Sequence, residues 1–275
     1  YIERYLAKTV EKWLNKNMVI IIYGARQVGK TTLTKALLAK HGSADGYYNC
    51  DLPEIRQVLE SQNHNLIKDY IGSKKMVVFD EAQQVRDIGK ILKILHDTYP
   101  DIQIIATGSS SFDLSNKLNE PLTGRSLTFI LYPFSLAELE NKFSRFDLSA
   151  KLGGFLTHGL YPAVVLADTA GRTLFLQNLA GNYLYKDVLM FENLRRSDLL
   201  DDLLKLLALQ IGAEVSMREL AVKLKCGVKT VERYLDLLEK SFVIFRLRPF
   251  SRNLRNEIGK KVKVFFYDVG VRNAI

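Results

Sequence analysis

The sequence has 275 residues, of which 47% are hydrophobic and 25% are charged. This composition is typical of a soluble globular protein, and the length allows one large domain or two ordinary ones. No stretch reaches the roughly 18 unbroken apolar residues that a membrane-spanning helix needs. We therefore expect no membrane-spanning helix in these residues and no membrane partner.

Two cysteines, Cys50 and Cys226, lie far apart and have no metal-ligand spacing. Free thiols favour a reducing compartment, and the N-terminus shows no basic-then-apolar signal segment. We therefore expect a cytoplasmic protein. Because the first residue is Tyr1 rather than Met, we expect the natural start to lie upstream.

The net charge of +9 is unevenly distributed along the chain. Residues 1–145 carry 19 basic and 16 acidic side chains, residues 146–214 carry 6 and 8, and residues 215–275 carry 14 and 6. The basic excess of the last segment favours contact with nucleic acid. A well-solvated basic surface is the alternative.

The first predicted elements surround a phosphate-loop pattern. Residues 1–16 have the periodicity of an amphipathic helix, with Trp13 expected to pack against a sheet. Residues 18–23 are apolar and mostly β-branched, as in a buried parallel strand, and residues 33–39 are predicted to be helical. Between strand and helix lies Gly24-x-x-x-x-Gly29-Lys30-Thr31.

This spacing gives the pattern a role in binding ATP. The two glycines let successive N–H groups point inward at phosphate, and the following helix adds its positive end. Lys30 is expected to reach the β- and γ-phosphates and to act in catalysis, and Thr31 to place its hydroxyl on Mg²⁺. The predicted nucleotide-binding residues are Gly24, Ala25, Arg26, Gln27, Val28, Gly29, Lys30, Thr31 and Thr32.

Residues 74–81 are the second informative stretch, after a short strand predicted at residues 46–51. An apolar strand ends there in two adjacent carboxylates, Asp80 and Glu81. Behind a phosphate loop, Asp80 is expected to anchor the magnesium shell through water, and Glu81 to polarise the attacking water. The alternative is that both carboxylates cap a helix at residues 82–85.

Further candidates follow in residues 101–131. A predicted strand starts at residue 101 and ends in hydroxyl side chains, so Thr107 and Ser109 are candidates for sensing the γ-phosphate or holding the water. Arg125 precedes a strand predicted at residues 126–131. It is a candidate arginine finger acting on a neighbouring subunit, with a structural ion pair as an equal alternative.

The remainder of the chain is predicted to be mainly helical. Residues 148–191 have a helical pattern that Gly153-Gly154 and residues 158–162 interrupt. Beyond them, helices are predicted at residues 202–211, 216–224 and 228–240, and strands at residues 242–247 and 263–267.

These last elements are the parts of a winged helix. Lys229, Thr230 and Arg233 would then lie on the exposed side of the third helix, where we expect them to contact DNA. The alternative is a winged helix used only for packing or for protein contact.

Taken together, the motifs resemble the AAA+ superfamily of phosphate-loop ATPases, and within it a group of bacterial and archaeal proteins described only as predicted ATPases. The resemblance covers essentially the whole chain. The residues that carry it are Gly24-Ala-Arg-Gln-Val-Gly-Lys-Thr31, Phe79-Asp-Glu-Ala-Gln83, Thr107-Gly-Ser-Ser110, Leu122-Thr-Gly-Arg125, Gly159-Leu-Tyr-Pro162 and Phe266-Tyr-Asp-Val-Gly270.

The resemblance implies an α/β fold with a three-layer, parallel-sheet phosphate-loop NTPase core at residues 1–145. A helical lid at residues 146–200 and a winged helix at residues 201–275 would follow. Members of the group often continue into a nuclease-like domain, which we expect to be absent from these residues.

The resemblance also implies an order of strands. The strand that ends near Thr107 would lie between the strands that end at Gly24 and Asp80. That order would bring Lys30, Glu81 and Ser109 around one γ-phosphate.

We therefore expect an enzyme, a Mg²⁺-dependent ATPase whose winged helix contacts double-stranded DNA. ATP is expected over GTP by the resemblance alone. The alternative is a nucleotide-gated switch with negligible turnover that contacts a protein partner. A homo-oligomer is a further candidate assembly, because Arg125 would need one to act in trans.

Overall fold

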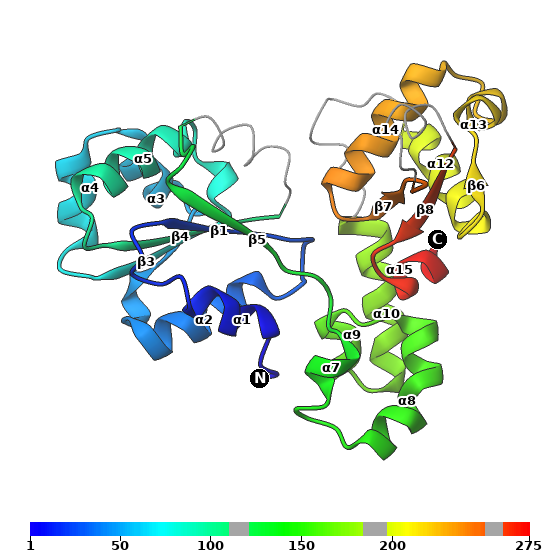
Figure 1. Ribbon diagram of the computed structural model, residues 1–275, viewed down its shortest axis with the longest axis horizontal. Helices are drawn as coiled ribbons and strands as arrows, with labels where there is room; N and C mark the ends of the chain where they lie inside the picture. The colour runs from blue at the N-terminus through cyan, green and yellow to red at the C-terminus, as the bar shows by residue number, and fades with distance from the viewer. Residues whose placement is uncertain (110–120, 184–196, 251–260) are drawn as a thin grey trace. The chain divides into compact units, whose positions relative to one another are not determined.

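Two compact units make up the chain (Figure 1). The computed structural model describes residues 1–109, 121–183, 197–250 and 261–275. The first unit holds residues 1–132 and 136–142, and the second holds residues 133–135 and 143–275. The predicted domain border at residue 145 lies close to residue 143, where the chain enters the second unit for the last time. The division of the second unit into a lid and a winged helix stays a prediction.

The first unit is built on a parallel sheet. Its strands are β1 (Val19–Tyr23), β2 (Tyr47–Asn49), β3 (Met76–Asp80), β4 (Gln103–Gly108) and β5 (Ser126–Ile130). They pair in the order β2-β3-β4-β1-β5, with every neighbouring pair parallel. β4 thus lies between β3 and β1, which confirms the expected order and the α/β class.

Helices cover both faces of this sheet (Figure 1). They are α1 (Tyr5–Glu11), α2 (Lys30–His41), α3 (Pro53–Glu60), α4 (His64–Ile71) and α5 (Ile88–Thr98), with the short α7 (Leu136–Leu139) after the sheet. α1 and α2 lie on one face, and α3, α4 and α5 pack together on the other. Every residue of β1 and β3 is buried, which explains their continuous apolar runs.

The N-terminal helix is shorter than predicted. α1 ends at Glu11, and both Asn15 and Asn17 have a left-handed backbone, with φ of 56° and 54°. Such a conformation cannot continue a helix, and asparagine tolerates it better than most residues. Trp13 lies beyond the helix and is 44% exposed. The expectation that it anchors the helix to the sheet is therefore wrong.

The second unit begins with helices. They are α8 (Arg145–His158), α9 (Pro162–Leu166), α10 (Thr169–Asn178), the π-helical η3 (Leu179–Tyr183) and α12 (Ser197–Leu209). Over the residues that the structure describes, no helix has both the length and the apolar character needed to cross a membrane.

α8 runs through Gly153 and Gly154, where the sequence suggested a break. A glycine inside a helix costs only about 1 kcal/mol. The capping box of Ser144 and Asp147 stabilises the start of α8, and the helix ends before Gly159, whose φ is +79°. Of the two predicted interruptions, the one at Gly153-Gly154 is therefore wrong, and the one at residues 158–162 is confirmed.

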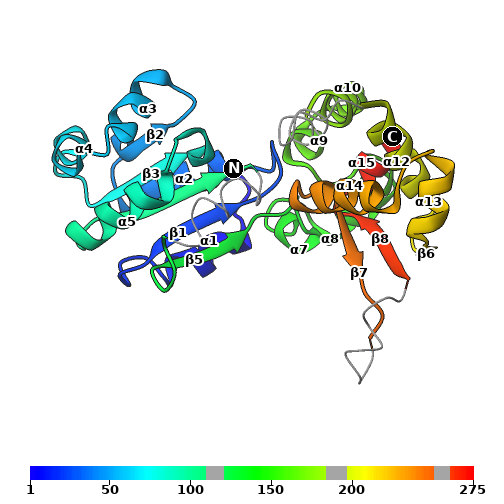
Figure 2. The ribbon, with the colours of Figure 1, turned by 90° about the horizontal axis from the view of Figure 1, so that it is seen from above.

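The end of the second unit combines helices with a small antiparallel sheet. Its elements are β6 (Glu214–Val215), α13 (Met217–Lys223), α14 (Val228–Lys240), β7 (Ile244–Leu247), β8 (Val262–Phe266) and α15 (Val269–Ala274). The strand order is β6-β8-β7, and Figure 2 shows β7 beside β8. The predicted helices and strands are present near their expected bounds, but β6 and α15 were not predicted. The assignment as a winged helix stays a prediction.

Asp268 joins two segments of the second unit. Its side chain is buried and accepts hydrogen bonds from Leu160 N at 2.7 Å and Val271 N at 3.1 Å. Burial raises the pKa of this carboxyl group, against the lowering effect of the backbone donors. A Cβ on Gly159 would lie 1.9 Å from Asp268 Oδ1, and one on Gly270 would lie 2.0 Å from His158 O. These close approaches explain why two distant motifs both contain glycine.

We predict that Gly270→Ala destabilises the second unit by about 1–3 kcal/mol, because the added methyl group collides with backbone. Gly153→Ala is the matched control: nothing lies within 4 Å of its added Cβ. It should stabilise the protein by about 0.5–1 kcal/mol. Urea unfolding of both variants measures the free energies. Equal changes in the two would contradict the proposed close approach.

Candidate functional site

The phosphate-loop pattern forms a tight connection between β1 and α2. Gln27 and Gly29 have left-handed backbones, with φ of 60° and 100°. A Cβ on Gly24 would lie 2.4 Å from Leu131 O, so only glycine fits where the loop begins. The nine predicted binding residues, 24–32, span this loop and the first turn of α2.

Lys30 lies inside this turn and is only 4% exposed. Its Nζ donates to Gly24 O at 3.0 Å and to Ala25 O at 3.1 Å. The same nitrogen lies 3.9 Å from Glu81 Oε1. The ammonium group is therefore placed between the loop and the end of β3.

Asp80 ends β3 as a buried carboxylate that three hydroxyl groups surround. Thr31 Oγ1 donates to Oδ2 at 2.6 Å, and Tyr47 OH donates to the same oxygen at 2.5 Å. Thr107 Oγ1 donates to Oδ1. Buried polar groups are costly unless hydrogen-bonded, so α2, β2 and β4 each contribute to holding this carboxylate.

Tyr47 is a site residue that the sequence did not reveal. Burial raises the pKa of its hydroxyl, and the neighbouring Asp80 raises it further, so the hydroxyl remains a donor. Lys35 Nζ lies 4.5 Å from the centre of the Tyr47 ring. The only sequence signal was its place in the predicted strand at residues 46–51, because its contact depends on the pairing of β2 with β3.

Glu81 follows Asp80 with a left-handed backbone, at φ 52° and ψ 44°. Its N–H donates to Thr107 Oγ1 at 3.1 Å, and its Oε2 accepts from Gln83 Nε2 at 2.5 Å. Gln83 Nε2 also donates to Ser109 Oγ at 3.3 Å. The structure thus brings Lys30, Glu81 and Ser109 to one edge of the sheet. Gln83 bridges Glu81 and Ser109, a role that the sequence analysis did not give it.

Asp51 lies near the same carboxylates. Burial raises the pKa of Asp51, and the negative charges of Glu81 and Asp80 add to the increase, while Arg26 lowers it. Arg26, one of the predicted loop residues, is therefore close enough to interact with an acidic rim of the site.

Arg125 lies away from these residues. It precedes β5, whose first residue pairs with the start of β1, so it is at the amino-terminal edge of the sheet. Its Nε donates to Asp97 Oδ1 at 2.8 Å. Within one chain the structure shows the ion-pair alternative, and a role in the site of a neighbouring copy stays a prediction.

The residues expected to contact DNA belong to the second unit, in the first turns of α14. Lys229 and Arg233 are exposed, and Thr230 is half-buried. The opposite side of α14 is apolar and buried, including Val231, Tyr234 and Leu235. This amphipathic pattern explains why the two basic side chains face outward.

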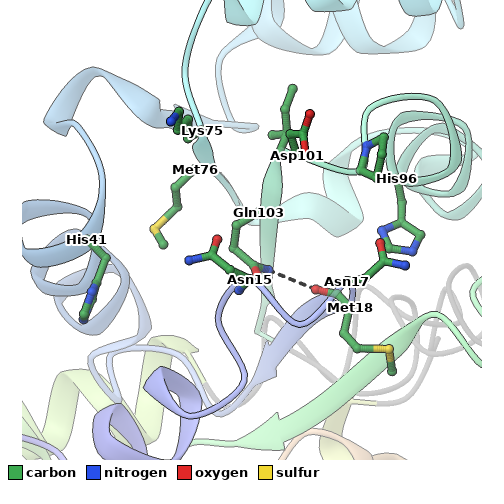
Figure 3. Close-up of a pocket in the computed structure, with 11 residues that line it drawn as sticks. Asn15, Asn17, Met18, His41, Lys75, Met76, His96, Asp101 and Gln103 are labelled. Atoms are coloured by element: carbon green, nitrogen blue, oxygen red, sulfur yellow. Dashed lines mark hydrogen bonds between the residues drawn. The ribbon is translucent and has the colours of Figure 1, made fainter.

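A separate hollow of about 530 Å³ lies at the amino-terminal edge of the parallel sheet (Figure 3). Gln103 Nε2 donates to Met18 O at 2.9 Å there, the dashed line of Figure 3. Gln103 Oε1 accepts from Asn15 N at 2.7 Å. Ligands of parallel sheets bind at the carboxyl ends of the strands. The hollow is therefore distinct from the phosphate-loop site.

Comparisons with protein families divide the chain between residues 140 and 150, close to where the second unit resumes at residue 143. Residues 16–140 match the family model of the AAA domain. Residues 150–275 match the model of a domain of unknown function, DUF8612. The motifs of the candidate site fall in the first of these matches.

Relatives extend over nearly the whole chain. An uncharacterized protein of Haemophilus influenzae is 25% identical over 289 residues, covering 98% of this chain and 72% of the relative. An uncharacterized protein of Methanocaldococcus jannaschii is 26% identical over 269 residues, covering 90% of this chain and 60% of the relative. This chain thus spans between about three fifths and three quarters of their lengths.

One similar solved structure is that of a signal-transduction ATPase from Pyrococcus horikoshii with a tetratricopeptide repeat sensor. The match covers all of this chain and 42% of the chain of that ATPase. The identity is 14% and the TM-score is 0.42. A likeness this low adds nothing to the assignment of function.

We predict that Tyr47→Phe lowers the free energy of unfolding by about 1.5–3 kcal/mol, the value of a hydrogen bond to a charged group. Tyr48→Phe is the control, because phenylalanine keeps the ring. The contacts of that ring with the rings of Tyr70 and Phe79, at 5.6 and 5.7 Å between centroids, would therefore be retained. Urea unfolding of the two variants gives the comparison. A loss at Tyr48 as large as that at Tyr47 would argue against the Asp80 contact.

Proposed function

Because residues 16–140 match the family model of the AAA domain, we propose that this chain binds and hydrolyses ATP with Mg²⁺. The second part of the proposal is that the nucleotide state is linked to DNA contact by the second unit. The observation that carries the first part is the convergence of Lys30, Asp80 and Glu81 beside the phosphate loop.

Phosphate binding follows from the loop and its helix. α2 has 12 residues, and its positive end lies where the loop ends at Gly29. Lys30 adds a buried positive charge beside the loop. These groups would hold the phosphates of ATP, with the β- and γ-phosphates nearest the Lys30 ammonium.

Thr31 and Asp80 fit a magnesium ion. The Thr31 hydroxyl has oxygen lone pairs for a metal and one proton, which it donates to Asp80 Oδ2. Mg²⁺ prefers few protein ligands together with phosphate oxygens and water. When bound, the ion would neutralise charge on the phosphates. Asp80 would act through water, held in place by Thr107 and Tyr47.

Glu81 is the residue that we assign to the attacking water. One of its carboxylate oxygens lies near Lys30 Nζ, and the other accepts from Gln83. These contacts orient the carboxylate as a general base. Ser109, which Gln83 joins to Glu81, would sense the γ-phosphate.

We predict that wild-type protein with Mg²⁺ releases phosphate from ATP at steady state. Glu81→Gln should bind ATP but lower kcat by about 10²–10⁴, the usual contribution of a general base. Lys30→Ala should lose ATP binding, because the phosphates lose their buried cation. Phosphate release and calorimetric binding of ATP are the measurements.

The two hypotheses for this site separate in the same assay. Phosphate release that Glu81→Gln leaves unchanged would reject the ATPase. Tight ATP binding without turnover in the wild type would instead support the nucleotide-gated switch, whose partner would then be a protein.

The predicted winged helix of the second unit would be the basis for DNA contact. α12, β6, α13, α14, β7 and β8 follow one another in the order of such a domain. Lys229 and Arg233 are exposed at the start of α14, in a segment with 14 basic and 6 acidic residues. Lysine and arginine contacts to phosphates supply most non-specific affinity for DNA.

We predict that Lys229→Ala combined with Arg233→Ala weakens binding to double-stranded DNA. The slope of log affinity against log salt should fall by about 1 for each lost phosphate contact. Lys240→Ala, at the other end of α14, is the control and should keep the wild-type slope. Fluorescence anisotropy at several salt concentrations measures this slope. Binding that does not depend on salt, or that survives the double substitution unchanged, would reject DNA contact through α14.

A further inference from the structure

Arg4 is a buried cation that precedes α1 and that the motif analysis did not mark. It is 4% exposed, although it stands three residues after the first residue of the sequence. Its Nε donates to Glu138 Oε1 at 3.0 Å. Its two terminal nitrogens donate to Val28 O at 2.9 Å and to Tyr132 O at 2.5 Å. Such a set of bonds uses the whole planar fork of an arginine.

The bond to Val28 O acts on the phosphate loop from its outer side. In a trans peptide, the C=O of Val28 and the N–H of Gly29 point in opposite directions. Holding the carbonyl by Arg4 therefore fixes the direction of the Gly29 N–H, away from Arg4. Lys30 holds Gly24 O and Ala25 O at the other end of the loop. Both ends of the anion-binding loop are thus held by a buried cation.

The other bonds of Arg4 reach the segment that joins the two units. Tyr132 is the last residue of the first unit before the chain crosses, and Glu138 belongs to the stretch that returns to the first unit at Leu136. Glu138 Oε1 also accepts from Tyr5 N at 2.9 Å. Arg4 therefore connects the phosphate loop to both flanks of residues 133–135.

Residues 133–135 are in turn bonded within the second unit. Phe134 N donates to Leu160 O at 2.9 Å. Leu160 N donates to the buried Asp268 carboxylate. The short crossing segment is thus tied to the turn at Gly159, whose position Asp268 fixes.

We propose that Arg4 is a positioning residue that aims the Gly29 N–H at the phosphates and couples ATP binding to the crossing segment at residues 133–135. The proposal rests on the proposed ATP binding. Coupling between two sites is reciprocal. ATP that orders the loop will therefore strengthen the bond between Phe134 and Leu160, and loss of Arg4 will weaken ATP binding and remove that response.

The test uses the full chain and two Arg4 variants. Arg4→Lys keeps a positive charge beside Glu138 but lacks the planar fork. Arg4→Met with Glu138→Gln removes both members of the ion pair, so neither is left buried and unpaired. The matched control is Lys40→Met with Glu11→Gln. That pair joins α2 to α1 at 2.8 Å, is more exposed, and contacts neither the loop nor the crossing segment in any bond that the structure shows.

Two readouts are needed. Calorimetry gives the affinity for ATP, and hydrogen exchange gives the protection of the Phe134 and Leu160 amides with and without ATP. We expect ATP to raise protection of these amides by about fivefold or more in wild type and in the control. Both Arg4 variants should lose this response and bind ATP about tenfold more weakly. Circular dichroism verifies that each variant is folded.

The outcomes separate a positioning role from a merely structural one. Arg4→Lys that melts earlier but binds ATP like the wild type, or keeps the exchange response, overturns the proposal. The same holds if the control loses the response to the same extent. Wild-type protein that binds ATP no better than Lys30→Ala would instead overturn the proposed function, and this inference with it.

Discussion

The hydrogen bonding of one buried carboxylate, that of Asp80, sets the geometry of the candidate site. A carboxylate that is 3% exposed must have its oxygens satisfied by the protein. Its donors are Thr31, Tyr47 and Thr107, which come from α2, β2 and β4. The site therefore depends on the strand order of the sheet, because that order brings the three hydroxyl groups to the end of β3.

The phosphate loop is shaped by contacts on each of its sides. Leu131 O lies so close to Gly24 that no larger residue fits. Lys30 holds the carbonyls where the loop begins, and Arg4 holds Val28 O where it ends. A loop whose N–H groups are directed in advance spends less binding energy on ordering itself around an anion. Preorganisation here depends on residues from three separate parts of the first unit.

The sequence was informative where structure depends on neighbours in the chain. The apolar runs of β1 and β3, the glycines of the phosphate loop and the helix at residues 228–240 could all be predicted from local pattern. Trp13 was misjudged because α1 ends at Glu11, before Trp13, and the side chain is 44% exposed. Tyr47 and Arg4 could not be found, since their partners lie 33 and 134 residues away in sequence. Such contacts exist only after the sheet has formed, and no short motif encodes them.

A nucleotide can change the second unit only by as much as its affinity differs between two arrangements of the protein. The candidate site lies in the first unit, whereas Lys229 and Arg233 lie in the second. The proposed coupling therefore requires an element that responds to the nucleotide and is bonded to the segment through which the chain leaves the first unit. The peptide that carries Val28 O meets the first condition, because its own N–H belongs to the phosphate loop. Arg4 meets the second, because it bonds that peptide to Tyr132, where the chain leaves the first unit.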